Sequence, residues 1–331
     1  MTQKSPAKVK FKGINQVCLV VKNTEEVVRN YWDILGIGPW EIYSWEAPLV
    51  YDYKYRGKPS WAKTKMALAQ VGGVQLELME HLDGFSIYQD FLREHGEGLN
   101  HMNFLVDDVD TTAEILAKEG FPSVQSGCWE PREKNGAYNY VDIKPLRAIW
   151  EPVHGRSIAA EPTRYPDTAE VSPAKVKVKA IAQVGIVVKN LEEVIENYWN
   201  ILGIEPWDIL ELVPPALHHQ TYHGKPSGFK IRVAFAPTGQ VQLGLLQPVS
   251  GDNIYSDFIA KHGEGLHHLR FIVDDINETT KIMNNEGFST LMSGRVSDGG
   301  FAYYDTGHAL KCIWEAFQVP RIMPATTGKA G

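Results

Sequence analysis

A twelve-residue stretch occurs twice in this chain of 331 residues, and the repeat constrains the fold more than any other feature. The first copy, EGLNHMNFLVDD, ends at Asp108, and the second, EGLHHLRFIVDD, ends at Asp275. The Asn-Tyr-Trp, GKPS and HGEGL segments recur at the same offset of 167 residues. Later the offset falls to 164, which indicates three residues lost from a loop near 295–300. A period this long is not that of a solenoid, so the chain is predicted to contain two domains of one fold.

The boundaries of the two domains follow from where the repeat begins and ends. We expect domain one over 11–153 and domain two over 179–318. The segment 154–178 contains three prolines and many turn-forming residues without apolar periodicity, as is typical of a linker.

A fainter repeat within each domain predicts the elements. INQVCLVVKN (14–23) and LNHMNFLVDD (99–108) share a strand-like apolar run, and each precedes a helical stretch. Val28, Tyr31, Trp32 and Leu35 have the spacing of one helical face, and Gly36 is a helix stop. Alternating apolar runs follow, including KTKMALAQV and VQLELME. These patterns predict an α+β protein of four βαβββ modules, two in each domain.

Charge and cysteine content exclude several classes of protein. A net charge of −7 with dispersed basic residues argues against nucleic-acid or anionic-membrane partners. The sequence contains no signal-like N-terminus and no membrane-length apolar run. The cysteines, Cys18, Cys128 and Cys312, lack the spacing of a disulfide framework or metal motif. We therefore expect a cytoplasmic protein.

The segment VQLELMEHLDGFSIYQDFLREHGEGLNHMNFLVDDV and its second copy resemble the vicinal oxygen chelate (glyoxalase/bleomycin resistance/dioxygenase) superfamily. Within it, methylmalonyl-CoA epimerase-like proteins are the most similar. The resemblance covers nearly the whole chain apart from linker and tails. It implies that paired modules curl into an incomplete barrel around a cleft, in which four side chains hold a divalent metal.

The resemblance also assigns metal-ligand positions. In domain one these are Gln16, Glu77, His101 and Glu151, and in domain two the weaker set is Gln183, His268 and Glu315, because Gly244 supplies no ligand. Carboxylates that interrupt apolar strands need a cation or strong donors when buried. Carboxylate, imidazole and amide ligands suit Mn, Co, Ni, Mg, Zn or Fe. The alternative for each histidine and glutamate is a hydrogen-bonded structural residue.

Two departures from the family pattern bear on the reaction. Glutamine replaces the usual first histidine in both copies, which argues against the two-histidine, one-carboxylate site of iron dioxygenases. The position of the epimerase base aligns near Trp61 and at Gly228, neither of which transfers protons. The acid–base role is therefore expected to fall to Glu77 or Glu151, with His101 as a metal-anchoring member of the catalytic set, or otherwise to Asp52 or His223.

Aromatic residues and histidines supply a candidate substrate wall. Ligand clefts are mostly apolar with few polar anchors, although such side chains can also pack on the other domain. The predicted pocket residues are Trp40, Tyr53, Trp61, Tyr138, Tyr140, His219 and His223. His267 precedes His268 on a strand and is expected to point away from the cleft.

Three functions remain open, and they are ranked. The first is a metal-assisted isomerase or epimerase that transfers a proton beside a carbonyl of a small, cyclic or aromatic substrate. The second is a metal-free protein that binds or sequesters small molecules. A ring-cleaving dioxygenase ranks last. The chain is expected to be a monomer with pseudo-dimeric domains or a homodimer.

Overall fold

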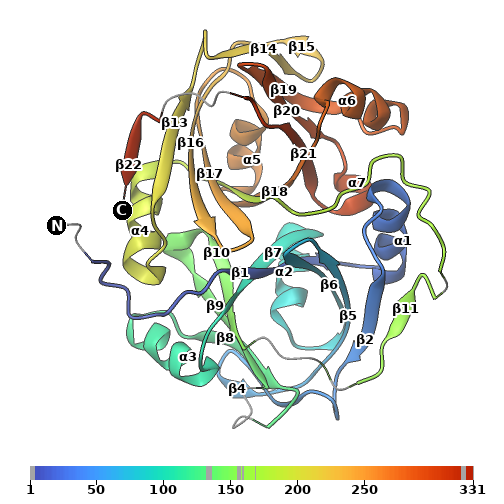
Figure 1. The fold of residues 1–331 in the computed structure, drawn as a ribbon. Helices are drawn as coiled ribbons and strands as arrows, with labels where there is room; N and C mark the ends of the chain where they lie inside the picture. The colour runs from blue at the N-terminus through green and yellow to red at the C-terminus, as the bar shows by residue number, and fades with distance from the viewer. Residues whose placement is uncertain are drawn as a thin grey trace.

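The two halves of the chain form two similar domains in the computed structural model (Figure 1). It describes residues 4–131, 136–154, 158, 160–167, 169–321 and 326–330. Each half contributes one curled sheet of eleven strands with a few helices packed against it. The predicted α+β class with two tandem half-barrel domains is confirmed. No helix within these residues is long and apolar enough to cross a membrane.

Domain one contains two modules in chain order. The first comprises β1 (Ile14–Val21), α1 (Thr24–Leu35), β2 (Trp40–Trp45), β3 (Tyr51–Tyr55), β4 (Lys58–Pro59), β5 (Ala62–Val71) and β6 (Val74–Gly84). The second comprises α2 (Ile87–His95), β7 (Gly98–Leu105), α3 (Val109–Lys118), β8 (Ser123–Cys128), β9 (Ala137–Ile143), a 3-10 helix (Lys144–Leu146) and β10 (Ala148–Val153). A short strand, β11 (Thr163–Tyr165), lies in the segment expected to be the linker.

Domain two repeats this arrangement. Its first module comprises β12 (Gln183–Val187), α4 (Leu191–Leu202), β13 (Trp207–Leu212), β14 (Leu217–Tyr222), β15 (Lys225–Pro226), β16 (Lys230–Thr238) and β17 (Val241–Ser250). Its second comprises α5 (Ile254–His262), β18 (Gly265–Ile272), α6 (Ile276–Asn285), β19 (Thr290–Val296), β20 (Gly299–Tyr304), α7 (Gly307–Leu310) and β21 (Ile313–Gln318). A last strand, β22 (Gly328–Ala330), pairs with β13 as β11 pairs with β2.

The strand order joins the two modules of each domain at their first strands. In domain one the order is β11-β2-β5-β6-β1-β7-β10-β9-β8-β3-β4. β1 and β7 are antiparallel at the centre, and each is parallel to the last strand of its own module. The hairpin of β3 and β4 leaves the first module and pairs with β8 at the far edge of the second. The hairpin therefore helps the sheet curl around a cavity.

Helix ends follow the sequence signals. The Asn23 side chain accepts a hydrogen bond from the Glu26 amide at the start of α1, which satisfies one of the free N–H groups of a helix N-terminus. The equivalent Asn190 caps α4 in the same way. Gly36 ends α1 in the left-handed region, at φ 65°, where a residue with a Cβ is strained.

The change of offset from 167 to 164 arises at two places. Cys128 pairs with Ala137 across the β8–β9 loop, whereas their equivalents Arg295 and Gly300 are only five positions apart. This loop is four residues shorter in domain two, and one residue is added before β21. The expected loss of three residues near 295–300 is thus the net of two changes. The β9–β20 register makes Tyr140 equivalent to Tyr303.

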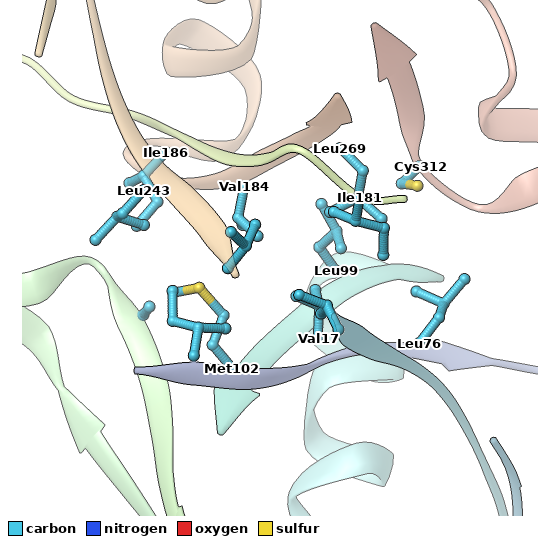
Figure 2. Close-up of a cluster of buried hydrophobic side chains, with 14 of the residues drawn as sticks. Val17, Leu76, Leu99, Met102, Ile181, Val184, Ile186, Leu243, Leu269 and Cys312 are labelled. Carbon is cyan, nitrogen blue, oxygen red and sulfur yellow. The ribbon is translucent and has the colours of Figure 1, made fainter. Parts of the chain in front are cut away.

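The central strands use one face for the contact between domains. Figure 2 shows Val17, Leu76 and Met102 of domain one close to Val184 and other apolar side chains of domain two. Val17 lies between Gln16 and Cys18, and Met102 lies between His101 and Asn103, so these polar residues face the opposite side. Removal of the apolar face from water favours the paired domains. The same alternation directs the polar face into the barrel.

The repeated Asn-Tyr-Trp motif forms pseudo-symmetric contacts between the domains. The hydroxyl of Tyr31 on α1 donates to the carbonyl oxygen of Leu310 at 2.8 Å. The hydroxyl of Tyr198 on α4 donates to the carbonyl oxygen of Leu146, also at 2.8 Å. Both tyrosines are fully buried. The motif is therefore explained by the domain interface and not by a reaction.

The HGEGL motif has a similar role. Glu97 pairs with Lys311 of the other domain at 3.2 Å, and Glu264 pairs with Arg147 at 3.0 Å. Each glutamate also accepts a backbone amide at the end of the neighbouring first strand, from Lys22 or Lys189. The motif thus links a strand entry to the domain contact.

The tyrosine contacts can be tested by deletion of a hydroxyl group. Tyr31→Phe is expected to lower the free energy of unfolding by about 1–3 kcal/mol, because the Leu310 carbonyl stays buried without its donor. Tyr198→Phe is the matched variant and should cost a similar amount. Urea unfolding followed by circular dichroism measures both. Stability unchanged in both variants would show that these bonds do not hold the domains together.

Candidate functional site

Domain one encloses a cavity of about 430 Å³ on the polar face of its central strands. Three of the predicted ligand positions line it, namely Gln16, Glu77 and Glu151. Tyr138 and Tyr140, predicted as pocket residues, line it as well. Ile158, Pro162 and Arg164 of the segment after β10 also contribute, so this segment covers part of the cavity in addition to connecting the domains.

Three ionisable side chains from three strands converge at the base of this cavity. His101 lies on β7, Glu77 on β6 and Glu151 on β10. The His101 Nε2 atom is 3.2 Å from a Glu77 Oε2 and 3.7 Å from a Glu151 Oε2. All three are buried, with His101 fully so. Strands distant in sequence therefore place two carboxylates around one imidazole nitrogen.

The orientation of the His101 ring leaves its Nε2 lone pair available. Its Nδ1 lies 2.9 Å from the Asn100 Oδ1, and with the Asn100 amide in this orientation the ring proton is on Nδ1. The buried His101 Nε2 and Glu77 Oε2 atoms have no hydrogen-bond partner within the described residues. A hydrogen-bond partner on the second ring nitrogen, as Asn100 is for His101, is typical of metal-binding histidines.

The electrostatics of the cluster also favour a bound cation. Burial, and then the charge of Glu77, raise the pKa of Glu151 well above its usual value, despite opposing hydrogen bonds from Tyr140 and Asn103. Two buried carboxylates without a cation are costly. A divalent ion would compensate both charges and would be held by the unpartnered His101 nitrogen and Glu77 oxygen. The side chains therefore fit a metal such as Mn, Co, Ni, Mg, Zn or Fe.

Gln16 lines the cavity but is held by its neighbours. Its Oε1 accepts a hydrogen bond from the Asn103 Nδ2 at 2.5 Å, and its Nε2 donates to the Gln75 Oε1 at 2.8 Å. Instead, the potential metal-ligand atoms of Cys18, Glu77 and His101 lie within 4.8 Å of one another. Cys18 lies two residues after Gln16, on the same face of β1. Burial, and then Glu77, raise the pKa of this thiol well above its usual value.

Five predicted pocket residues lie elsewhere, and their assignment is corrected. Trp40 is in the hydrophobic core, where its indole N–H donates to the Ile37 carbonyl. Tyr53 donates to the Phe85 carbonyl outside the cavity, and Trp61 is 50% exposed. His219 and His223, on and beside β14, are exposed, as is Asp52. Tyr53 still packs against the hydrophobic cluster that contains Cys18 and Tyr138, but it does not line the cavity.

Other aromatic side chains form the wall that the sequence suggested. Tyr43 and Trp45 on β2 line the cavity together with Trp129 after β8. Trp45, Trp129 and Tyr138 form a cluster with ring centroids 5.9–6.3 Å apart. The signal that could have identified Tyr43 and Trp45 is alternation, since they share the face opposite to Trp40. Trp129 lies in a loop and carries no such signal.

Domain two neutralises its buried glutamate with an arginine. Glu315 accepts hydrogen bonds from the Arg270 Nε at 2.6 Å and from the Arg270 Nη2 at 3.0 Å. Arg270 is equivalent to Asn103, and its charge lowers the pKa of Glu315 against the effect of burial. His268 Nε2 lies 3.1 Å from the same carboxylate. The Arg270 guanidinium therefore binds both oxygens of Glu315, the carboxylate that a metal would need as a ligand.

Two glycines complete this difference between the domains. A Cβ on Gly244, the equivalent of Glu77, would lie 2.7 Å from the Gln183 Cδ. A Cβ on Gly185, the equivalent of Cys18, would lie 2.0 Å from the His268 Cε1. The Gln183 and His268 side chains thus fill the space of the missing ones. The predicted second metal site of Gln183, His268 and Glu315 is corrected: within the described residues, this group is a neutral ion-pair cluster.

Domain two nevertheless retains a cavity of about 320 Å³. Its lining is mostly apolar and includes Val233, Phe235 and Phe317, with Arg270 and Glu315 at the polar end. The Arg270 guanidinium lies 4.5 Å from the Phe317 ring centroid and 5.6 Å from that of Phe235. His267 is outside this cavity, as expected, and contacts the His268 Nδ1 at 3.0 Å through its own Nδ1.

Comparison with known proteins supplies a family match. The model described as Glyoxalase/Bleomycin resistance protein/Dioxygenase superfamily matches residues 15–140 and 182–304, which is more than half of the chain. The uncharacterized protein YqjC of Bacillus subtilis (strain 168) is 28% identical over 103 residues, 31% of this chain. The chain spans 64% of the length of that relative.

Solved structures with a similar fold support the architecture. A triple mutant of 4-hydroxymandelate synthase from Streptomyces coelicolor has a TM-score of 0.59 and 16% identity, covering 96% of this chain and 94% of that one. A fusion of a xylose isomerase-like TIM barrel with 4-hydroxyphenylpyruvate dioxygenase has a TM-score of 0.53 and 14% identity, covering 98% and 51%. At these identities the similarity concerns the fold alone.

The raised pKa of Glu151 gives a pH-dependent prediction for the protein kept in a chelator. A carboxyl whose folded-state pKa is raised contributes stability at low pH, and this stability is lost as the pH rises through the folded-state value. At about pH 8, Glu151→Gln is therefore expected to unfold at a higher temperature than the wild type. The difference should shrink as the pH falls towards about 5, which calorimetry measures. A wild type at least as stable as the variant at about pH 8 would contradict it.

Proposed function

Because the chain belongs to the Glyoxalase/Bleomycin resistance protein/Dioxygenase superfamily, we propose that domain one is a metal-dependent isomerase or epimerase. It would transfer a proton beside a carbonyl group of a small cyclic or aromatic compound. The observation that carries the proposal is the pair of buried, unpartnered atoms, His101 Nε2 and Glu77 Oε2, next to a second carboxylate on an aromatic-lined cavity.

We assign different tasks to the two glutamates. Glu77 and His101 would hold the cation, since their unpartnered atoms are 3.2 Å apart. When bound, a divalent metal supplies Lewis-acid polarisation of a carbonyl oxygen. Glu151 is farther from His101, at 3.7 Å, and lines the cavity. Its carboxylate would take the proton from the adjacent carbon and return it to another face or atom.

The cavity wall supports the substrate class. Tyr43, Trp45, Trp129 and Tyr138 give flat apolar surfaces, which suit a ring better than a flexible chain. A volume of about 430 Å³ suits a small molecule. The closeness to methylmalonyl-CoA epimerase-like proteins stays a prediction, and the wall argues against an acyl-CoA ester. A ring-cleaving dioxygenase ranks lower, since Gln16 stands where a second histidine is needed.

The proposal is tested by metal content and proton exchange together. The probe is one enantiomer of 2-methyl-1-tetralone in deuterium oxide, followed by mass spectrometry and optical rotation. Metal-loaded wild type should incorporate deuterium and lose optical rotation. Glu151→Gln should keep its metal but slow exchange by roughly 10²–10⁴-fold, the usual contribution of general acid–base catalysis. Glu77→Gln and His101→Ala should lose both metal and exchange.

Glu114→Gln, on the exposed face of α3, is the matched control and should change neither readout. Loss of metal in Glu151→Gln with retention in Glu77→Gln would show that the roles are assigned wrongly. A wild type that binds no divalent metal at one ion per chain would refute the metal-dependent enzyme.

A second function is favoured for domain two by the Arg270–Glu315 pair in an otherwise apolar cavity. We propose that this cavity binds a small, neutral, mostly apolar molecule without a metal. Arg270 uses its Nε and Nη2 for Glu315, and its Nη1 hydrogens remain for an acceptor oxygen on the ligand. A charged ligand is disfavoured, because the buried pair is already neutral.

The second function is tested with 2-naphthol, a fluorescent molecule with one hydroxyl, in the presence of a chelator. We expect Val233→Phe to lose one saturable site per chain, because the added ring fills the cavity of domain two. Met66→Phe changes the equivalent position in the cavity of domain one, serves as the matched control and should keep that site. A number of sites that is unchanged in Val233→Phe, or no saturable binding to the wild type, would refute the proposal.

A further inference from the structure

We propose that Cys18, and not Gln16, is the third side chain that binds the cation in domain one, and that its thiolate selects Zn, Co or Fe over Mg and Mn. The inference rests on the proposed metal-dependent function and deepens it. Its basis is the position of Cys18 in the sheet, the occupied hydrogen bonds of Gln16, and the difference between the two domains.

The sheet places Cys18 directly between the two metal-holding residues. On β1, Cys18 is paired in register with Glu77 of β6 on one side and with His101 of β7 on the other. Adjacent paired residues of a sheet point to the same face. Accordingly a Cys18 sulfur, a Glu77 oxygen and a His101 nitrogen all lie within 4.8 Å of one another, and all three residues are buried.

Gln16 is less suited, because its amide already has partners. The Oε1 that would bind a metal accepts the Asn103 amide, and the Nε2 donates to Gln75. Domain two keeps the second of these bonds, from Gln183 to Gln242 at 2.5 Å, although its carboxylate is neutralised by an arginine. A contact that persists without a metal site is explained as a structural link between the first and last strands of a module.

Two of the three residues that the proposal uses differ between the domains. Cys18 and Glu77 are replaced in domain two by Gly185 and Gly244. At Gly185 the His268 ring lies so close to the backbone that a Cβ would be 2.0 Å from its Cε1. In domain one the Cys18 side chain excludes that ring position. The sulfur therefore lies beside His101, whose Nε2 stays unpartnered.

Sulfur changes which metal the site prefers. A thiolate with an imidazole and a carboxylate suits Zn, Co or Fe, whereas Mg and Mn prefer sets made of oxygen. On binding, the S–H bond breaks, the proton passes to solvent, and a bond forms between sulfur and the cation without any change of oxidation state. Metal binding should therefore release a proton, as expected for a thiol ligand.

The test uses Co²⁺, because a thiolate bound to this ion gives a charge-transfer band in the near ultraviolet. Metal-free protein is titrated with cobalt chloride while absorption and bound cobalt are measured. The wild type should develop the band, saturating at one Co²⁺ per chain. Cys18→Ser should lose the band and bind Co²⁺ at least about tenfold more weakly, the lower limit for loss of even an outer-shell partner.

Three controls separate the possible outcomes. Cys18→Gly copies the residue of domain two and should behave like Cys18→Ser, with the fold checked by circular dichroism. Cys312→Ser, a buried cysteine at the domain interface, and Gln16→Met should both keep the band. Stoichiometric Co²⁺ without the band, or a band that survives in Cys18→Ser, refutes the role of Cys18 and leaves the metal-dependent function standing. No stoichiometric Co²⁺ binding by the wild type refutes the role of Cys18, and if Mg²⁺ and Mn²⁺ also fail to bind, the metal-dependent function is refuted as well.

Discussion

The structure depends on how each domain compensates a buried carboxylate in the middle of the last strand of its second module. Glu151 and Glu315 occupy equivalent positions and are both almost fully buried. Domain two compensates Glu315 internally, with a guanidinium held by two hydrogen bonds. Domain one has an uncharged Asn103 at the arginine position and adds a second carboxylate, Glu77. Because burial of uncompensated charge is so costly, a cation bound at this carboxylate pair would stabilise domain one.

Strand alternation lets this chemistry coexist with the domain contact. The residues between the candidate ligands, such as Val17 and Met102, form the apolar surface that joins the two domains. On each central strand, one set of alternate residues faces the other domain and the other set faces the cavity. One consequence is that the cavity floor is held by the domain interface. Another is that repeated motifs such as Asn-Tyr-Trp and HGEGL serve the interface, and so recur in both halves whatever their chemistry.

Much of the fold could be predicted from the sequence, because duplication makes the pattern visible twice. The two domains, their four modules and the caps at Asn23 and Asn190 follow from spacing alone. The resemblance to a family directed attention to Glu77, His101 and Glu151, which the structure brings together. Pairing across the sheet is not encoded locally. The hairpin of β3 and β4, which joins the opposite edge, was therefore not foreseen.

The details of the site were harder to predict for reasons that differ by residue. Aromatic content alone places Trp40 in the pocket, whereas its position in the alternation of β2 directs it into the core. Arg270 stands in the second copy of the opening motif, where the first has Asn103, but its meaning depends on contact with Glu315, 45 positions away. Cys18 could have been noticed because its equivalent is a glycine, yet a lone cysteine on a strand usually belongs to the core. Only the register with Glu77 and His101 gives it chemistry.

The most direct test of the account is the location of bound metal in crystals of the cobalt-loaded chain, measured by anomalous scattering at the cobalt edge. The account predicts one strong peak per chain, in contact with Glu77 and His101, and no peak beside Glu315 because Arg270 occupies that position. A peak at Glu315, or no peak in domain one, would contradict it.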